Sequence, residues 1–180
     1  NPAKYALFVS FFPQLIQGPI SFYDQLAHQL YAERNFSYKN LKHGTLLMLW
    51  GYFKKMVIAD RAVSLIQMVA PDYMQYNGTV IFITVLVYAL QLYADFSGGI
   101  DISRGFAEIL GIEMAENFCR PYFAVSINDY WRRWHITLGA WMKNYVFYSL
   151  AMSKRFFKMG KNLKQKYGDH AVGAHIAKVL

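Results

Sequence analysis

The sequence predicts an all-α membrane protein, a polytopic helical bundle with re-entrant or interfacial helices. Two observations lead to this fold class. Of the 180 residues, 55% are hydrophobic, 18% are aromatic and only 17% are charged, whereas a typical soluble domain carries about 25% charged residues. Long stretches without any charge also occur along the chain, and about 20 apolar residues in a helix cross a bilayer.

The first uncharged stretch lies between Lys4 and Asp24 and reads "YALFVSFFPQLIQGPISFY". Pro13, Gly18 and Pro19 interrupt a regular helix there. Irregular backbone at membrane depth is tolerated only where protein or a water-filled cavity surrounds it. We therefore expect a span that breaks near Pro13, or a re-entrant segment.

The next segment mixes apolar and charged residues. Residues 24–43 are polar and predict a connection, while Thr45–Ala70 is apolar at both ends. Each charge at the centre of a membrane helix costs about 2.5–3.5 kcal/mol on insertion scales. We expect two shorter helices, or one helix lying partly in the interface. The central charges belong to Lys54, Lys55, Asp60 and Arg61.

The clearest membrane span is Thr79–Ala94, "TVIFITVLVYALQLYA". No charge falls between Asp72 and Asp95. The intervening residues reach about 33 Å as a helix, just over a bilayer core of about 30 Å. This span runs directly into the segment "YADFSGGID".

Two carboxylates of that segment, Asp95 and Asp101, allow two interpretations. They mark the exit of the helix at the interface, or they are buried acids that hold a polar cavity or orient a base. The glycines between them permit a bend or close packing.

A helix is predicted to start near Ile127, because Ser126 and Asp129 have the spacing of a capping box. This helix carries the stretch "NDYWRRWHITLGAW". Asp129 and Arg133 are four residues apart and can pair on one face. Helical spacing also places Trp131 one turn before His135, and Trp134 on another stripe together with Trp141.

His135 is the candidate catalytic residue, and two interpretations remain open. In the first, it is a headgroup-level polar residue in an interfacial aromatic belt with snorkelling arginines. In the second, its neutral imidazole is a base at membrane depth that accepts a hydroxyl proton. Arg132 and Arg133 would disfavour the imidazolium and bind an anion, and Trp131 and Trp134 would complete the pocket.

Several other chemistries lack support. The single cysteine, Cys119, excludes an intramolecular disulfide and a cysteine-based metal cluster. The sequence contains no H-E-x-x-H, G-x-S-x-G or P-loop motif, so we predict no metal site and no serine triad. We expect His28 and His43 to be solvated. His170 and His175 are five residues apart and do not share a helical face.

The net charge of +8 is concentrated in one run, Lys154–Lys166, which has six basic residues and no acid. Beside membrane segments, such a run indicates a cytoplasmic loop. No nucleic-acid-binding motif accompanies it, so we expect the lipid bilayer and no nucleic acid as a partner.

Four blocks, in order and at matching spacing, resemble the membrane-bound O-acyltransferases (MBOAT). The likeness is greatest to the bacterial branch with the alginate O-acetylation membrane subunit and the D-alanyl transfer protein of teichoic acid modification. The blocks are "FFPQLIQGPI" (Phe11–Ile20), "YADFSGGID" (Tyr93–Asp101), "ENFCRPY" (Glu116–Tyr122) and "INDYWRRWHITLGAWMKNYVF" (Ile127–Phe147).

The resemblance implies that residues 1–180 are the central part of a single MBOAT-like membrane domain with a tunnel through the bilayer and no separate soluble domain. It implies a multi-pass protein of the bacterial inner or plasma membrane. The family's functional histidine matches His135. A second family histidine lies in a W-H-G segment, which does not occur here, so we expect the chain to be a piece of a longer polypeptide.

The implied reaction moves an acyl group, expected to be acetyl, across the membrane to a cell-surface polysaccharide. The donor is acyl-CoA or an acyl carrier thioester as co-substrate, with no bound cofactor, and an exported acyltransferase is the expected partner. The acceptor stays open among alginate, teichoic acid, peptidoglycan and other exopolysaccharides. Two alternatives are a membrane transporter or channel and a structural scaffold that presents the basic run.

Overall fold

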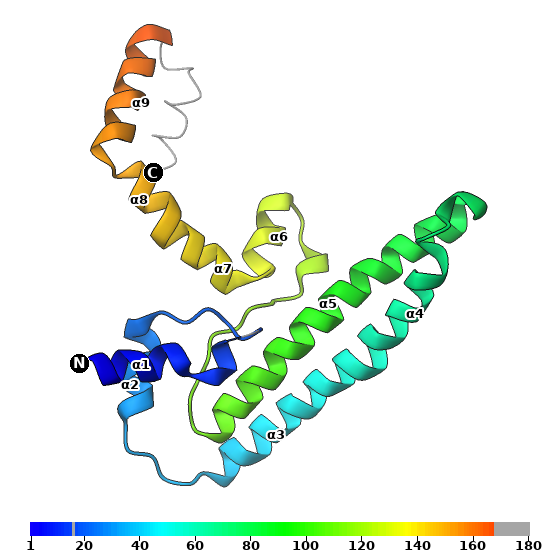
Figure 1. Ribbon diagram of the computed structural model, residues 1–180, viewed down its shortest axis with the longest axis horizontal. Helices are drawn as coiled ribbons and strands as arrows, with labels where there is room; N and C mark the ends of the chain where they lie inside the picture. The colour runs from blue at the N-terminus through cyan, green and yellow to red at the C-terminus, as the bar shows by residue number, and fades with distance from the viewer. Residues whose placement is uncertain (16, 168–180) are drawn as a thin grey trace. The chain divides into compact units, whose positions relative to one another are not determined.

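The structure, a computed structural model, describes residues 1–15 and 17–167. These residues are mostly helical and form no β-strand, which confirms the all-α prediction for this part of the chain (Figure 1). They divide into two compact units, Asn1–Thr137 and a second unit that begins at Leu138.

The longest helix is α5 (Gly78–Ile109), with 32 residues and a length of about 48 Å. Its first turn is capped by the Asn77 side chain, which accepts from the Val80 amide. Its end is a Schellman motif, in which Gly111 has a φ of 74° and Ile112 N donates to Ala107 O. The segment "YADFSGGID" therefore lies inside α5, and the expected helix exit at the interface does not occur there.

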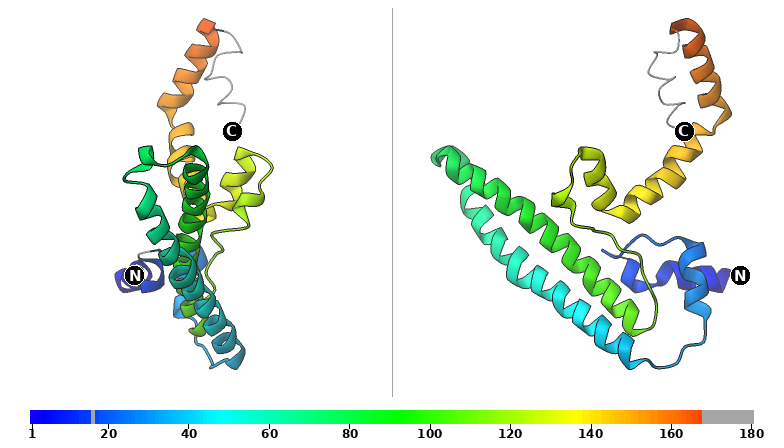
Figure 2. Two further views of the ribbon diagram at one scale, coloured as in Figure 1. Left: turned by 90° about the vertical axis from the view of Figure 1, so that its right-hand side faces the viewer. Right: turned by 180° about the vertical axis from the view of Figure 1, so that it is seen from behind.

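A second long helical run lies beside α5 and consists of α3 (Tyr38–Tyr52), a π-helical segment (Phe53–Ala59) and α4 (Asp60–Val69). It passes through the central charges without a break, and Figure 2 shows it along α5 in both views. Residues 24–43 were wrongly predicted as a connection. They include most of α2 (Tyr23–Tyr31) and the start of α3, which the Ser37 side chain caps.

Glycines let the two runs approach closely. A Cβ added at Gly51 would lie 2.6 Å from the carbonyl oxygen of Gly98, and one added at Gly44 would lie 2.4 Å from that of Gly105. Such a distance leaves no room for a side chain. The glycines of the "DFSGGID" segment therefore serve close packing, and α5 does not bend there (Figure 1).

The N-terminal uncharged stretch breaks as predicted. Helix α1 (Pro2–Ser10) ends at Phe11, whose ψ is 101°, and a 3-10 turn (Phe12–Gln14) follows. Pro13 explains the break, because proline has no backbone N–H to donate and its ring clashes with the carbonyl four residues earlier, so a regular helix does not continue through it. A small core joins this segment to α2 and to the end of α5. It consists of Phe11, Leu26, Ala107, Ile112 and Met114.

Within the described residues, α5 is the helix long and apolar enough to cross a membrane. Only 6% of its most apolar 18-residue stretch is buried inside the structure. Those side chains are therefore available to contact lipid or further helices. The part of the chain that the structure describes contains one such helix, so the polytopic bundle stays a prediction.

The second unit is helical as well. It continues from α7 (Ile136–Trp141) through a π-helical segment (Met142–Phe147) and α8 (Tyr148–Ala151) to α9 (Lys154–Tyr167). The basic run forms α9, so it is helical where a loop was expected. His170 and His175 lie outside the described residues.

Candidate functional site

The candidate site starts at α6 (Ile127–Arg133), and its first turn confirms most of the predicted capping box. Ser126 Oγ accepts from the Asp129 amide at 3.1 Å. The Asp129 carboxylate reaches back to the Val125 amide at 3.2 Å, one residue further than expected. Its other oxygen accepts from Arg133 Nε at 2.9 Å, so the predicted pair is present. This hydrogen bond lowers the pKa of Asp129.

The sequence predicted that this helix continues through His135, but α6 ends at Arg133. Trp134 is extended, and His135 has a φ of 47° before α7 begins. The expected placement of Trp131 one turn before His135, and of Trp134 on a stripe with Trp141, is therefore wrong. A non-glycine residue in a sparsely populated conformation such as this costs about 1–3 kcal/mol and persists only when its surroundings hold it.

The segment 117–119 stabilises this backbone conformation of His135. Phe118 and Trp134 form an isolated antiparallel bridge. The Cys119 amide donates to Arg133 O at 2.9 Å, and the Ile136 amide donates to Asn117 O at 3.0 Å. These bonds replace the ones that a continuing helix would make, so they stabilise the break.

The Asn117 side chain, only 1% exposed, lies at the centre of the site. Its Oδ1 accepts hydrogen bonds from Thr137 N at 3.0 Å and from Thr137 Oγ1 at 2.9 Å. The same oxygen lies 3.1 Å from His135 Nδ1, within hydrogen-bond distance. Thr137 Oγ1 in turn accepts from the Ile20 amide at 3.1 Å. One hydrogen-bond network thus joins three of the sequence blocks.

The fourth block reaches His135 through Phe96 of α5. The two rings meet edge to face with centroids 4.8 Å apart. Burial lowers the pKa of His135 below its usual 6.5. The sequence predicted this direction, but attributed it to Arg132 and Arg133. Arg133 is instead paired with Asp129, and Arg132 is exposed.

The tryptophans differ in their surroundings. Trp134 packs into an aromatic cluster, whereas Trp131 is 61% exposed and contacts Tyr130. The rings around Trp134 belong to Tyr93, Phe118, Tyr122 and Tyr130.

Asp95 and Asp101 pair with lysines of the neighbouring helical run. Lys55 Nζ lies 2.7 Å from Asp95, and Lys54 Nζ lies 2.6 Å from Asp101. Among the described residues, neither carboxylate has a hydrogen bond or ion pair with His135. The prediction that these acids orient a base is therefore not met; Asn117 occupies that position. Asp95, with a third of its side chain exposed, is also not a buried acid.

Asp101 does line a small polar cavity of about 130 Å³ beside Asn117. Two buried nitrogens that lack a hydrogen-bond partner in the described structure, Asn117 Nδ2 and Arg104 Nε, belong to residues of its lining. Both are donors, so the cavity favours an occupant with acceptor oxygens. Lys54 also lines it and donates to Ser97 Oγ at 2.9 Å.

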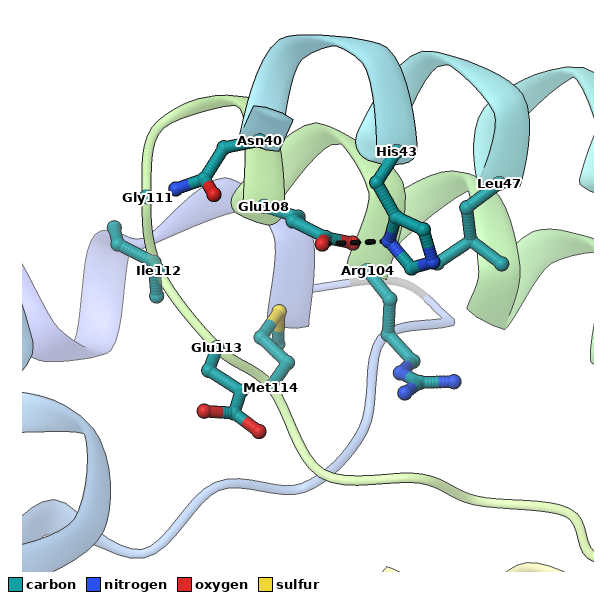
Figure 3. A pocket seen from close by; sticks show the side chains of 9 residues that line it. All are labelled: Asn40, His43, Leu47, Arg104, Glu108, Gly111, Ile112, Glu113 and Met114. Carbon is teal, nitrogen blue, oxygen red and sulfur yellow. Dashed lines mark hydrogen bonds and ion pairs between the residues drawn. The ribbon is translucent and has the colours of Figure 1, made fainter. Parts of the chain in front are cut away.

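A larger cavity of about 300 Å³ lies between α3, the end of α5 and the segment after it (Figure 3). His43, expected to be solvated, is exposed but lies with its Nδ1 2.6 Å from Glu108. His28 is exposed as predicted, and its ring contacts the Asp24 carbonyl. In the described part of the chain, no cluster of three His, Cys, Asp or Glu side chains could hold a metal ion.

Three residues of the site were missed by sequence reasoning: Asn117, Thr137 and Phe96. Each lies inside a block that the sequence singled out. Asn117 offered the clearest signal, since an amide between Glu116 and Phe118 in a loop is a polar group that needs a partner. The partner itself comes from a residue 18 positions later.

Comparison of the sequence with known proteins shows the family of this chain. A sequence profile of the MBOAT, membrane-bound O-acyltransferase family matches residues 1–163. The chain is 40% identical over 148 residues to the peptidoglycan O-acetyltransferase of Helicobacter pylori, covering 81% of this chain and 28% of that protein. It is 35% identical over 150 residues to a Pseudomonas aeruginosa protein named "Probable alginate O-acetylase AlgI", covering 83% and 28%.

A further relative is the teichoic acid D-alanyltransferase of Bacillus subtilis, 29% identical over 144 residues, with 78% of this chain and 36% of that protein covered. The chain belongs to the membrane-bound O-acyltransferase family. It spans about a third of the length of these relatives.

Proposed function

We propose that this chain is part of a multi-pass O-acyltransferase of the bacterial cell membrane, which transfers an acetyl group to a cell-surface polysaccharide with His135 as the base. The convergence of all four sequence blocks on this imidazole supports the proposal. Ile20, Phe96 and Asn117 come from three of them. Phe96 and Asn117 contact the ring directly, and Ile20 is linked to it through Thr137 and Asn117.

The proposed reaction uses one proton transfer in each direction. His135 takes the proton of an acceptor hydroxyl while the oxygen attacks the acyl carbon of a thioester donor. The carbon–sulfur bond breaks, the new ester forms, and the imidazolium returns its proton to the leaving thiolate. A base of this kind works best when its pKa lies near the operating pH, and exclusion of water limits hydrolysis of the donor.

The side chains around His135 have supporting roles in this proposal. Arg132 is exposed and unlike Arg133 is not held by Asp129, so its guanidinium can bind an anionic group of donor or acceptor. Trp131 is exposed beside it and offers an apolar surface. In the polar cavity beside Asn117, the unpaired nitrogens of Asn117 and Arg104 can donate to acceptor oxygens, while Asp101 can accept from a hydroxyl.

Acetyl is favoured as the acyl group because the relatives of 40% and 35% identity are named for O-acetylation. The names of the relatives concern peptidoglycan, alginate and teichoic acid, so we propose a cell-surface polymer of this kind as the acceptor. We further propose a thioester as the acyl donor. The proposed partner is an exported acyltransferase that completes the transfer. Residues 1–180 form the central part of one membrane domain.

The test replaces His135 with Ala in the full-length protein that contains this chain. We expect polymer acylation to fall by about 10²–10⁴-fold, the usual contribution of a general base, with expression and membrane insertion unchanged. His28→Ala is the matched control, because that histidine is exposed and its ring contacts the Asp24 carbonyl of its own helix. Normal acyl content in the His135→Ala strain would overturn the proposal. Solute flux through proteoliposomes without a donor would instead support a transporter.

A further inference from the structure

We infer that Asn117 is the positioning residue of the site, which fixes the tautomer of His135 and leaves Nε2 as the basic nitrogen. This inference rests on the proposed function of His135. It concerns a residue outside the Trp-Arg-Arg-Trp-His stretch, in a different segment of the chain.

The identity of the atom facing His135 follows from a backbone contact. The Thr137 amide lies 3.0 Å from the same Asn117 side-chain atom. A backbone N–H can only donate, so this atom must be the oxygen of the carboxamide. An amide oxygen can only accept, so His135 Nδ1, at 3.1 Å, must carry the proton of the neutral ring.

The opposite nitrogen, Nε2, then holds the free lone pair. An imidazole whose Nδ1–H is bound by an acceptor presents Nε2 as its base, because one nitrogen of the neutral ring donates and the other accepts. Phe96 packs edge to face against the ring and offers no competing acceptor.

Asn117 also holds the backbone on which the ring sits. Its carbonyl accepts from the Ile136 amide, and its Oδ1 accepts from both the amide and the hydroxyl of Thr137. These bonds flank His135, whose φ of 47° needs support from its surroundings. Asn117 is nearly fully buried, so the position of its carboxamide is determined by packing.

Among the described residues, no charged side chain has a hydrogen bond or ion pair with the ring. Arg133 is engaged by Asp129, and Arg132 is exposed on α6. The neighbours from the other elements, Asn117 and Phe96, are neutral. A charge introduced at position 117 would therefore be the dominant electrostatic change felt by His135.

The decisive variant is Asn117→Asp, which keeps an acceptor oxygen of the same shape and adds a negative charge. An opposite charge beside Nδ1 favours the imidazolium. We expect the acid limb of the kcat/KM profile to move to higher pH while the protein stays folded. A side chain at position 117 that does not face Nδ1 would leave this limb in place. The matched control is Asn77→Asp, which adds the same charge at the N-cap of α5, where aspartate caps equally well.

Asn117→Ala supplies a second measurement. Loss of the acceptor frees the ring, so kcat is expected to fall by roughly 10- to 100-fold, the usual effect of removing a residue that orients a functional imidazole. ¹⁵N shifts of labelled histidine should show the Nδ1–H tautomer at His135 in the unaltered protein, with the signal assigned by its loss in His135→Ala. In Asn117→Ala the two tautomers should mix.

The outcomes separate this inference from the proposed function. An unmoved acid limb in Asn117→Asp, or an Nε2–H tautomer in the unaltered protein, would overturn the positioning role alone. Full acylation in His135→Ala would overturn the proposed function itself. If Asn117→Ala fails to fold, Asn117→Asp and the tautomer measurement still decide the question.

Discussion

At the scale of single residues, His135 combines a strained backbone with a ring held on two sides. Its φ of 47° is one of two positive values at non-glycine residues in the described structure; the other, 45°, belongs to Arg120 in the loop that follows Asn117. Both sit where segment 117–119 meets the break between α6 and α7. Backbone strain tends to occur at functional sites, and the strain at this candidate base agrees with that tendency.

The burial of His135 predicts the pH dependence of the reaction. Since burial lowers its pKa below 6.5, the neutral base persists at pH values where an exposed histidine is protonated. We expect the acid limb of kcat/KM to lie below pH 6.5. Phe96→Ala uncovers the ring and should move the limb upward, towards 6.5.

The control for this measurement is Phe82→Ala, at an exposed position of the same helix. An acid limb that lies above 6.5 in the unaltered protein, or that moves downward in Phe96→Ala, would contradict the burial effect.

The lowered pKa of His135 also affects the stability of the fold. The unfolded chain binds the proton more readily at this site, so the contribution of His135 to the free energy of unfolding declines as the pH falls through about 6.5.

At the scale of elements, the pairing of α5 with the run from α3 to α4 depends on small residues and buried charge. Gly51 and Gly98 bring the backbones together, and the neighbouring Lys54 is 6% exposed yet paired with Asp101 and Ser97. A charge removed from water needs such partners. The sequence had suggested that the central charges divide this run, but a π-helical segment carries them without interruption.

The close approach of these helices gives a direct test of packing. Gly51→Ala places a Cβ 2.6 Å from the Gly98 carbonyl and 2.7 Å from Ile102 Cγ1. The helices must separate to accommodate it, so we expect the free energy of unfolding to fall by about 1–3 kcal/mol. Thermal unfolding of the full-length protein in detergent measures the change.

Gly78→Ala is the matched control in the neighbouring helix. A Cβ at that position meets no atom within 4 Å. The substitution therefore adds only helix propensity, and stability should stay the same or rise by about 0.5–1 kcal/mol. Equal midpoints for the Gly51 and Gly78 variants would contradict the close packing of the two runs.

At the scale of the whole molecule, we expect α5 to determine how the chain meets the bilayer. Its length of about 48 Å exceeds a hydrocarbon core of about 30 Å. The charge-free first half fits that core, while the second half carries Asp95, Asp101, Arg104 and Glu108. The site residues that α5 supplies, from Tyr93 to Arg104, begin at the end of the apolar span. We therefore expect the candidate site to lie near the end of the span.

Cysteine accessibility tests this placement. In a cysteine-free full-length protein, Leu86→Cys should resist a membrane-impermeant maleimide in open membrane fragments, because lipid or other helices cover it. Gln75→Cys, in the exposed turn before α5, should react rapidly. Equal reaction rates at the two positions would show that α5 does not cross the bilayer. Denaturation in detergent should make both cysteines reactive.

The sequence by itself determined the all-α class, the apolar span in α5, the break at Pro13, the Asp129–Arg133 pair and His135 as the candidate base. These features depend on composition, on proline sterics or on residues a few positions apart. A turn of helix or an uncharged stretch brings such residues together without help from the rest of the chain.

Only the tertiary structure decided the break at His135, the contacts of Asn117 and the partners of Asp95 and Asp101. Each depends on contacts between residues far apart in sequence: Asn117 with Thr137, Lys54 with Asp101, and Ile20 with Thr137. A helical pattern continues through Trp134 and His135 in the sequence. Hydrogen bonds from segment 117–119 outweigh that local preference, because buried backbone groups must find partners and this segment supplies them.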